Sequence, residues 1–280
     1  MNNTFNINRF GSLLAYDGRK YIRNFGITLA ILCGLNLVLW LLTLIFGFTM
    51  PTLPRYGIIW LAVFLSIIMV PAKAFGDINL PREGVSYAIL PVSNLEKYLS
   101  YVLFCLLTPV VIIFGSWAID SLLTLLPWGG FEHYIRHFGF GGLMTDFVVE
   151  LTEMTGEDMT GQEIFDQTVM DFFGSKYNYA IIISFIFNAG LFMFGNLLFK
   201  THKTGKTLAA TIGISYVLSM IMQIILLANG RSLFLNPENV DIATIGTLTN
   251  SMFLASNIFN TILTIALFIG LFFKLKTQKY

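Results

Sequence analysis

The chain has 280 residues, of which 55% are hydrophobic and 12% carry a charge, and its formal net charge at pH 7 is +1. A soluble globular domain carries about 25% charged residues, so this composition excludes an ordinary soluble protein. Because the apolar residues fall in long blocks, the sequence predicts an all-α polytopic membrane protein, with lipid around it and no nucleic-acid partner.

Six apolar blocks are long enough to cross a bilayer as helices. A span needs about 20 apolar residues, because every backbone N–H and C=O group in lipid must be paired within the protein. The predicted spans are Ile27–Phe48, Gly57–Phe75, Leu99–Leu126, Tyr179–Phe199, Leu208–Ala228 and Ser251–Phe273. We therefore expect a single transmembrane domain, residues 1–280, with both termini on the same side.

The segment 1–26 precedes the first span. Apolar residues recur in it at helical spacing, and basic residues lie beside them. The apolar set is Phe10, Leu13, Leu14 and Tyr21, and the basic set is Arg19, Lys20 and Arg23. This pattern predicts an amphipathic helix on the inner leaflet, with its cations near anionic lipid. A plain basic flank of the first span is the simpler alternative.

A charged, turn-rich segment, residues 77–98, separates the second and third spans. Pro81 and Gly84 interrupt regular structure, and Ser93 followed by Glu96 forms a capping box that predicts a helix start. We expect the apolar side chains Tyr87, Ile89 and Leu90 to rest on the membrane surface, and the charged Arg82, Glu83, Glu96 and Lys97 to face water. The segment is thus predicted to be a short structured elbow.

The largest polar region, residues 127–178, is a predicted helical insertion between spans three and four. Its two apolar stripes are Met144, Phe147, Val148 and Leu151, and then Ile164, Phe165, Thr168, Val169, Phe172 and Phe173. Amphipathic helices of this kind must bury their stripes against each other, the membrane surface or a partner. A compact cap without a ligand is the simplest interpretation, and a docking surface or gating lid is the alternative.

Two motifs that could carry chemistry are incomplete. Gly205-Lys206-Thr207 lacks the upstream glycine of a phosphate-binding loop, so the chain is not expected to hydrolyse nucleotide by itself. His133 and His137 have the spacing of two zinc ligands on a helix, but Tyr134 stands where a metalloprotease has glutamate. We therefore expect no metal, no cofactor and no enzymatic activity.

The polar residues inside the predicted spans are almost all neutral, and Asp120 is the only acidic one. Neutral polar groups in spans most often hydrogen-bond between helices. Ion-coupled carriers usually bury charges near the midplane, so the scarcity of charge argues mildly against that class. A set that could line a polar pathway consists of Asn36, Gln223, Asn257, Asn260, Thr261 and Thr264.

The distribution of basic residues predicts the orientation of the chain. Of the 17 lysines and arginines, all but four lie at the termini, in or beside the elbow, or in the loop 200–207. The exceptions are Arg55, Arg136, Lys176 and Arg231. Because basic loops stay in the cytoplasm, both termini and the elbow are predicted to be cytoplasmic, and the 127–178 insertion extracytoplasmic.

The elbow resembles the membrane subunits of type-2 ABC transporters, the exporter-type permeases. The residues that carry the resemblance are Arg82-Glu83-Gly84, Leu90-Pro91-Val92-Ser93 and Glu96-Lys97. That family also has six spans, cytoplasmic termini and an amphipathic N-terminal helix. The opening of the chain, from Asn8 to Lys20, resembles small permease-like proteins of Bacteroidetes. The 127–178 insertion departs from the family, whose usual elaboration lies between spans five and six.

The resemblance implies a permease subunit of an ATP-driven exporter in a bacterial inner membrane. The elbow would then be a coupling helix that inserts into a groove of a separate ATP-binding subunit, and two permease chains would pair as a homodimer. The implied coupling residues are Arg82, Glu83, Gly84, Tyr87, Leu90, Pro91, Ser93, Glu96 and Lys97. A non-transporting scaffold or sensor of the same fold and an ion-coupled carrier remain the alternatives.

Overall fold

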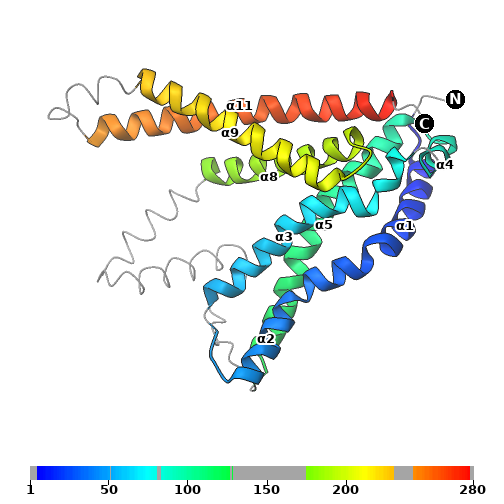
Figure 1. Ribbon diagram of the computed structural model, residues 1–280, viewed down its shortest axis with the longest axis horizontal. Helices are drawn as coiled ribbons and strands as arrows, with labels where there is room; N and C mark the ends of the chain where they lie inside the picture. The colour runs from blue at the N-terminus through cyan, green and yellow to red at the C-terminus, as the bar shows by residue number, and fades with distance from the viewer. Residues whose placement is uncertain are drawn as a thin grey trace. The chain divides into compact units, whose positions relative to one another are not determined.

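The computed structural model describes residues 5–50, 52–80, 83–126, 128, 175–229 and 242–277. All the longer elements in these ranges are α-helices (Figure 1), which confirms the predicted all-α class. The two helices predicted within the 127–178 insertion lie outside the described residues.

Within the described residues, three helices are long and apolar enough to cross a membrane. They cover Pro54–Ala74, Asn94–Thr124 and Leu254–Lys276. A fourth candidate is the pair Ile7–Cys33 and Leu35–Phe46, which is bent by 42°. These candidates correspond to predicted spans two, three, six and one. Predicted spans four and five form helices, but the six-span topology is not confirmed.

The chain divides into two compact units, and the single transmembrane domain stays a prediction. Unit 1 comprises residues 1–75 and 99–174, and unit 2 comprises residues 76–98 and 175–280. Unit 1 contains α1 (Ile7–Cys33), α2 (Leu35–Phe46), α3 (Thr52–Ala74) and most of α5 (Asn94–Thr124). Unit 2 contains the 3₁₀ turn η1 (Gly76–Asn79), α4 (Glu83–Ile89), the first turn of α5, α8 (Ser175–Leu198), α9 (Lys203–Asn229) and α11 (Ile242–Lys276).

In unit 1 the predicted amphipathic helix and the start of the first span form one helix, α1. Its buried side chains, Leu13, Asp17, Tyr21, Phe25 and Leu32, recur at intervals of four or seven residues and so share a face. The ring of Tyr21 stacks on Phe104 of α5, with centroids 5.4 Å apart. This face of α1 is therefore covered by protein, where the sequence predicts contact with lipid headgroups.

A seam of side-chain contacts joins α1 and α2 to α5. The hydroxyl of Ser100 donates to Oδ2 of Asp17 at 2.6 Å, and the hydroxyls of Tyr21 and Thr108 lie 2.8 Å apart. Further along, the amide of Asn36 contacts Asp120. The partners in these three contacts are separated by 83, 87 and 84 residues, so the two chain segments run parallel along the whole seam.

The break between α1 and α2 lies at Gly34. A Cβ at this position would lie 3.1 Å from the carbonyl oxygen of Ala30, so a larger residue would crowd the bend. Next to the break, Cys33 approaches α5 closely, because a Cβ on Gly115 would lie only 3.1 Å from Sγ of Cys33. Cys33 thus fills space at the seam.

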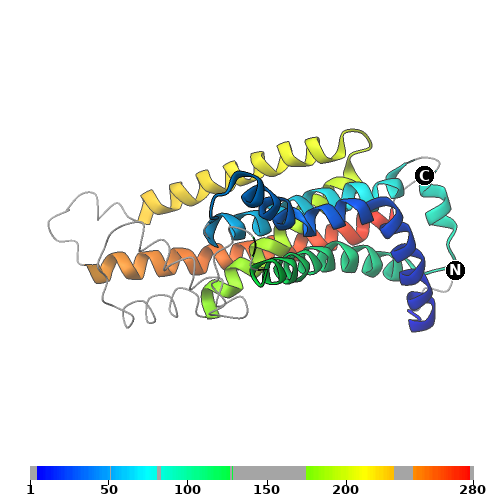
Figure 2. The same ribbon diagram turned by 90° about the horizontal axis from the view of Figure 1, so that it is seen from below.

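Unit 2 is built on α8, which packs against α11 and α9 (Figure 1 and Figure 2). Two glycines of α8 permit this close approach. A Cβ on Gly190 would overlap Leu267 of α11, and a Cβ on Gly195 would overlap Thr207 of α9. Small residues at helix contacts let backbones approach, as is common in membrane proteins.

Candidate functional site

The elbow, residues 77–98, begins α5 as the sequence predicts. The backbone N–H of Ser93 donates to Oε2 of Glu96 at 2.7 Å, and the backbone N–H of Glu96 donates to Oγ of Ser93 at 3.2 Å. These reciprocal bonds satisfy two donors at the start of α5, whose first residue is Asn94. The predicted capping box is confirmed.

The prediction that Glu96 and Lys97 face water is wrong, since their exposed fractions are 0% and 5%. Glu96 is held by the cap. Lys97 extends back to α4, where its ammonium donates to the carbonyl oxygen of Ala88 at 3.0 Å and lies 5.6 Å from the centre of the Tyr87 ring. The last carbonyls of a helix lack partners within it, and this short helix uses Lys97 as a donor.

Tyr87 is also buried, so its predicted position on the membrane surface is wrong. Its ring lies beneath the Lys97 ammonium, where the negative face of the ring favours a cation. Tyr87 and Lys97 thus join α4 to the start of α5 inside the elbow. Charge and polarity along the sequence could not reveal the contact between Tyr87 and Lys97, because it depends on how the chain turns between the two helices.

Contacts with distant helices fix the elbow within unit 2. The amide of Asn79 donates to the carbonyl oxygens of Phe199, at 3.0 Å, and of Asn196, at 3.4 Å. The hydroxyl of Tyr98 donates to the carbonyl oxygen of Phe268 in α11 at 3.3 Å. In addition, Nζ of Lys203, at the start of α9, donates to the carbonyl oxygen of Gly76. The elbow therefore touches α8 and α11, and the residue just before it touches α9.

Among its described residues, the elbow exposes three large apolar side chains, as well as the polar Ser86 and Asn94. Val85 and Ile89 are both exposed and lie four residues apart on α4, and Leu95 is exposed at the start of α5. Among the predicted coupling residues, Pro91 is exposed, Leu90 is partly buried, and Gly84 and Ser93 are buried. Arg82 and the side chain of Glu83 lie outside what the structure describes. The sequence interpretation missed Val85 and Leu95 as surface residues, although the spacing of Val85 and Ile89 could have indicated one face.

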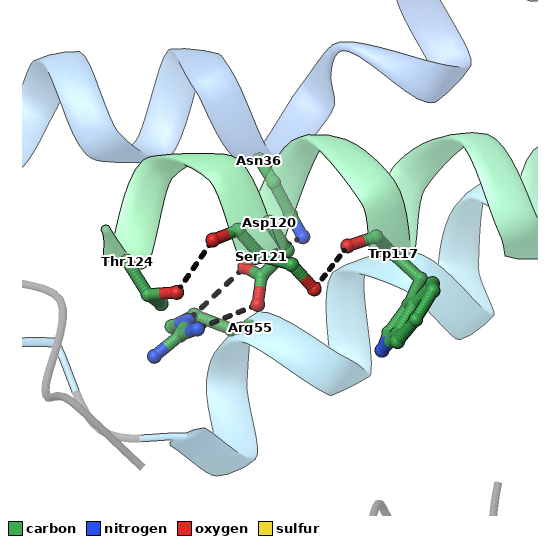
Figure 3. Close-up of polar contacts among 6 residues, drawn as sticks. All are labelled: Asn36, Arg55, Trp117, Asp120, Ser121 and Thr124. Atoms are coloured by element: carbon green, nitrogen blue, oxygen red, sulfur yellow. Dashed lines mark hydrogen bonds and ion pairs between the residues drawn. The ribbon is translucent and has the colours of Figure 1, made fainter. Parts of the chain in front are cut away.

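A second polar site lies in unit 1, around Asp120 (Figure 3). Nη2 of Arg55 lies 2.5 Å from Oδ2 of Asp120, and Nε of Arg55 donates to Oδ1 at 3.1 Å. The amide of Asn36 donates to the same Oδ1 at 3.1 Å. The side chains of Arg55 and Asp120 are 4% and 6% exposed. Three helices, α2, α3 and α5, thus meet at one carboxylate.

This cluster corrects two sequence expectations. Arg55 is not in a loop, because α3 begins at Thr52 and the candidate span at Pro54. Two candidate spans also contain a buried ion pair that the sequence interpretation missed, although Arg55 lies at the end of its span and not near the midplane. Asp120, the partner of Arg55, is 65 residues away in the sequence. No local sequence pattern could therefore indicate the pair.

The predicted pathway residues are divided between the two units. Asn36 belongs to the Asp120 cluster in unit 1, and Gln223 lies on α9 of unit 2. On α11 the hydroxyls of Thr261 and Thr264 donate to the carbonyl oxygens of Asn257 and Asn260 in their own helix. A pathway along these residues stays a prediction.

Metal ligands do not gather in the part of the chain that the structure describes, since no group of three or more histidine, cysteine or acidic side chains could hold an ion there. His133 and His137 lie outside the described residues. In comparisons with known proteins, no family model matches this chain, and neither a curated protein nor a solved structure is significantly similar to it.

Proposed function

We propose that this protein is the membrane permease subunit of an ATP-driven exporter in a bacterial inner membrane, moved through its elbow by a separate ATP-binding subunit. The observation that carries the proposal is the construction of the elbow. Internal contacts of Ser93, Glu96 and Lys97 stiffen it, and contacts of Asn79 and Tyr98 attach it to long helices. A partner that displaced such an element would displace those helices with it.

The exposed apolar face of α4 is the surface that we assign to the ATP-binding subunit. Val85 and Ile89 project from it, whereas the buried charges of the elbow serve its internal structure. This differs from the coupling set that the resemblance implies, in which charged residues contact the partner. An apolar projection fits a groove with an apolar floor, because removal of apolar surface from water drives association.

The proposed sidedness agrees with one contact inside unit 2. The loop 200–207 and the elbow are both predicted to be cytoplasmic from their basic residues. In the structure Lys203, in that loop, donates to the carbonyl oxygen of Gly76, the residue just before the elbow. Two segments in contact at helix ends must share one side of a membrane, as the proposal requires.

The test compares the same substitution, isoleucine to aspartate, at two exposed positions. Ile89, 72% exposed on α4, and Ile7, 68% exposed at the start of α1, are each replaced by aspartate. The chain is then purified from its native membrane, and the ATPase activity that accompanies it is measured. We expect Ile89→Asp to remove most of the accompanying activity, because a charge would be buried in an apolar groove, and Ile7→Asp to retain it.

Retention of ATPase activity by Ile89→Asp would show that this face does not couple to a partner. Absence of any ATPase with the unaltered chain would contradict the permease proposal and support a scaffold or sensor.

The buried ion pair favours one second candidate, an ion-coupled carrier. Ionisable residues inside spans commonly mark ion or substrate pathways, and Arg55 and Asp120 both lie in candidate spans. The two functions differ in their energy source. Transport by vesicles that persists after ATP depletion and stops when ion gradients are dissipated would identify the carrier.

A further inference from the structure

The Asp120 cluster lies beside the bend between α1 and α2. Gly34 separates the two helices, and Asn36, buried just after the bend, donates to Asp120 of α5. On the other side of Asp120, Arg55 binds the carboxylate through two nitrogens. One carboxylate, that of Asp120 near the end of α5, therefore joins the start of α2 to the start of α3 (Figure 3).

The placement of these charges does not stabilise the individual helices. Arg55 lies in the first turn of α3, where the helix dipole disfavours a cation. Asp120 lies towards the end of α5, where the dipole gives an anion no support. The two charges are thus compensated mainly across the helix contact, so the pair acts between helices.

The seam around the cluster buries several polar atoms that form no hydrogen bond. Among the described residues, Oδ1 of Asn36, Nε1 of Trp40 and Oγ of Ser116 have no hydrogen-bond partner. Asn36 and Trp40 are one turn apart on α2, and Ser116 is one turn before Asp120 on α5. Buried polar atoms without partners destabilise the arrangement that buries them. The closed seam therefore depends on the bonds to Asp120.

We propose that Asn36, Arg55 and Asp120 form a latch, and that its release lets α2 move about Gly34 and opens the seam between α2 and α5. Gly34 is the hinge, because its backbone already departs from the helix and it carries no side chain that would obstruct the movement. The latch sets the balance between a closed and an open state of unit 1. It goes beyond the coupling function of the elbow and does not depend on it.

The test measures access of water-soluble reagent to Ser116, which is 2% exposed in the closed seam. Ser116→Cys is made in a chain that carries Cys33→Ala and Cys105→Ala, and its rate of reaction with a charged methanethiosulfonate is measured in lipid nanodiscs. We expect Asp120→Asn to raise this rate by about tenfold or more, because the open state becomes populated.

The matched control is Asp17→Asn, which makes the same change at another buried carboxylate of the seam, bonded to Ser100. We expect it to leave the reaction rate at position 116 unchanged. The double exchange Arg55→Asp with Asp120→Arg should restore protection, because Asn36 can accept from arginine through Oδ1 as it donates to aspartate through Nδ2.

Two results would overturn the latch: full protection of the introduced thiol in Asp120→Asn, or equal exposure in Asp17→Asn, which would indicate general loosening. If Asp120→Asn does not fold, Arg55→Lys is the variant that tests the latch. Lysine keeps the positive charge but cannot bind the carboxylate in a bidentate manner. The latch requires an intermediate rate in that variant, and an unchanged rate contradicts it.

Discussion

The ion pair of Arg55 and Asp120 is buried because each charge compensates the other. Removal of a single ion from water costs several kcal/mol, and attraction to a partner offsets this only with good geometry and further hydrogen bonds. Here the guanidinium binds both carboxylate oxygens, and Asn36 supplies another donor. The loss of one member therefore leaves an uncompensated buried charge. This destabilises the protein more than the loss of both members.

This asymmetry gives a prediction for stability. Asp120→Ala should lower the free energy of unfolding by about 3–5 kcal/mol, because it leaves the Arg55 guanidinium buried without its carboxylate. The double variant Arg55→Met with Asp120→Leu should lose far less, because neither charge remains. Thermal unfolding in detergent micelles measures both. A single variant as stable as the double would show that the pair is exposed in the native protein.

Residue size limits how closely the helices of unit 2 can pack. α8 and α9 approach each other closely at Gly195, where three side-chain atoms of Thr207 occupy the space of a Cβ. Thr207 cannot rotate away freely, because it is buried and its hydroxyl donates to the carbonyl oxygen of Lys203 at 2.7 Å. Gly205, two residues before Thr207 on α9, has no atom within reach of a Cβ.

The two glycines should therefore respond oppositely to alanine. Gly195→Ala should destabilise the protein by about 1–3 kcal/mol, because overpacking forces the helices apart. Gly205→Ala should be neutral or stabilise it by up to about 1 kcal/mol through helix propensity. Thermal unfolding of the two variants compares them directly. Thr207→Ala should partly rescue Gly195→Ala, and a failure to rescue would place the clash elsewhere.

Local patterns in the sequence predicted individual elements well and long-range contacts poorly. The capping box of Ser93 and Glu96 depends on residues three positions apart, and the structure forms it as predicted. The contacts of Asn79 and Tyr98 join residues 120 and 170 positions apart. Local periodicity contains no information about such partners, and for the same reason the ion pair of Arg55 escaped notice.

At the scale of the whole molecule, the hydropathy of the sequence predicted where the apolar helices lie along the chain. It did not predict which helices pack together in one unit. Among the described residues, candidate spans occur where three of the six were predicted, or four if the bent pair α1 and α2 is one span. The elbow, however, belongs to the unit formed with α8, α9 and α11, although it follows α3 along the chain. Apolar residues indicate that a helix is buried in lipid or protein, and only shape complementarity, as at Gly190 and Gly195, selects its neighbour.

The proposed topology can be tested with single cysteines in a chain that lacks Cys33 and Cys105. Ile89→Cys in the elbow and Thr201→Cys before α9 should react with a membrane-impermeant maleimide only from the cytoplasmic side, since both segments belong to the basic side of the chain. Trp128→Cys, which follows α5, should react only from the opposite side. Right-side-out and inside-out vesicles distinguish the two faces.

Two outcomes of this labelling would contradict the topology. Reaction of Ile89→Cys and Thr201→Cys from different sides would be incompatible with the contact between Lys203 and Gly76, which holds the elbow and the loop 200–207 together. Reaction of Trp128→Cys from the cytoplasmic side would mean that α5 does not cross the membrane. Because a permease must connect its cytoplasmic elbow to helices that span the bilayer, the exporter proposal would then fail at its first requirement.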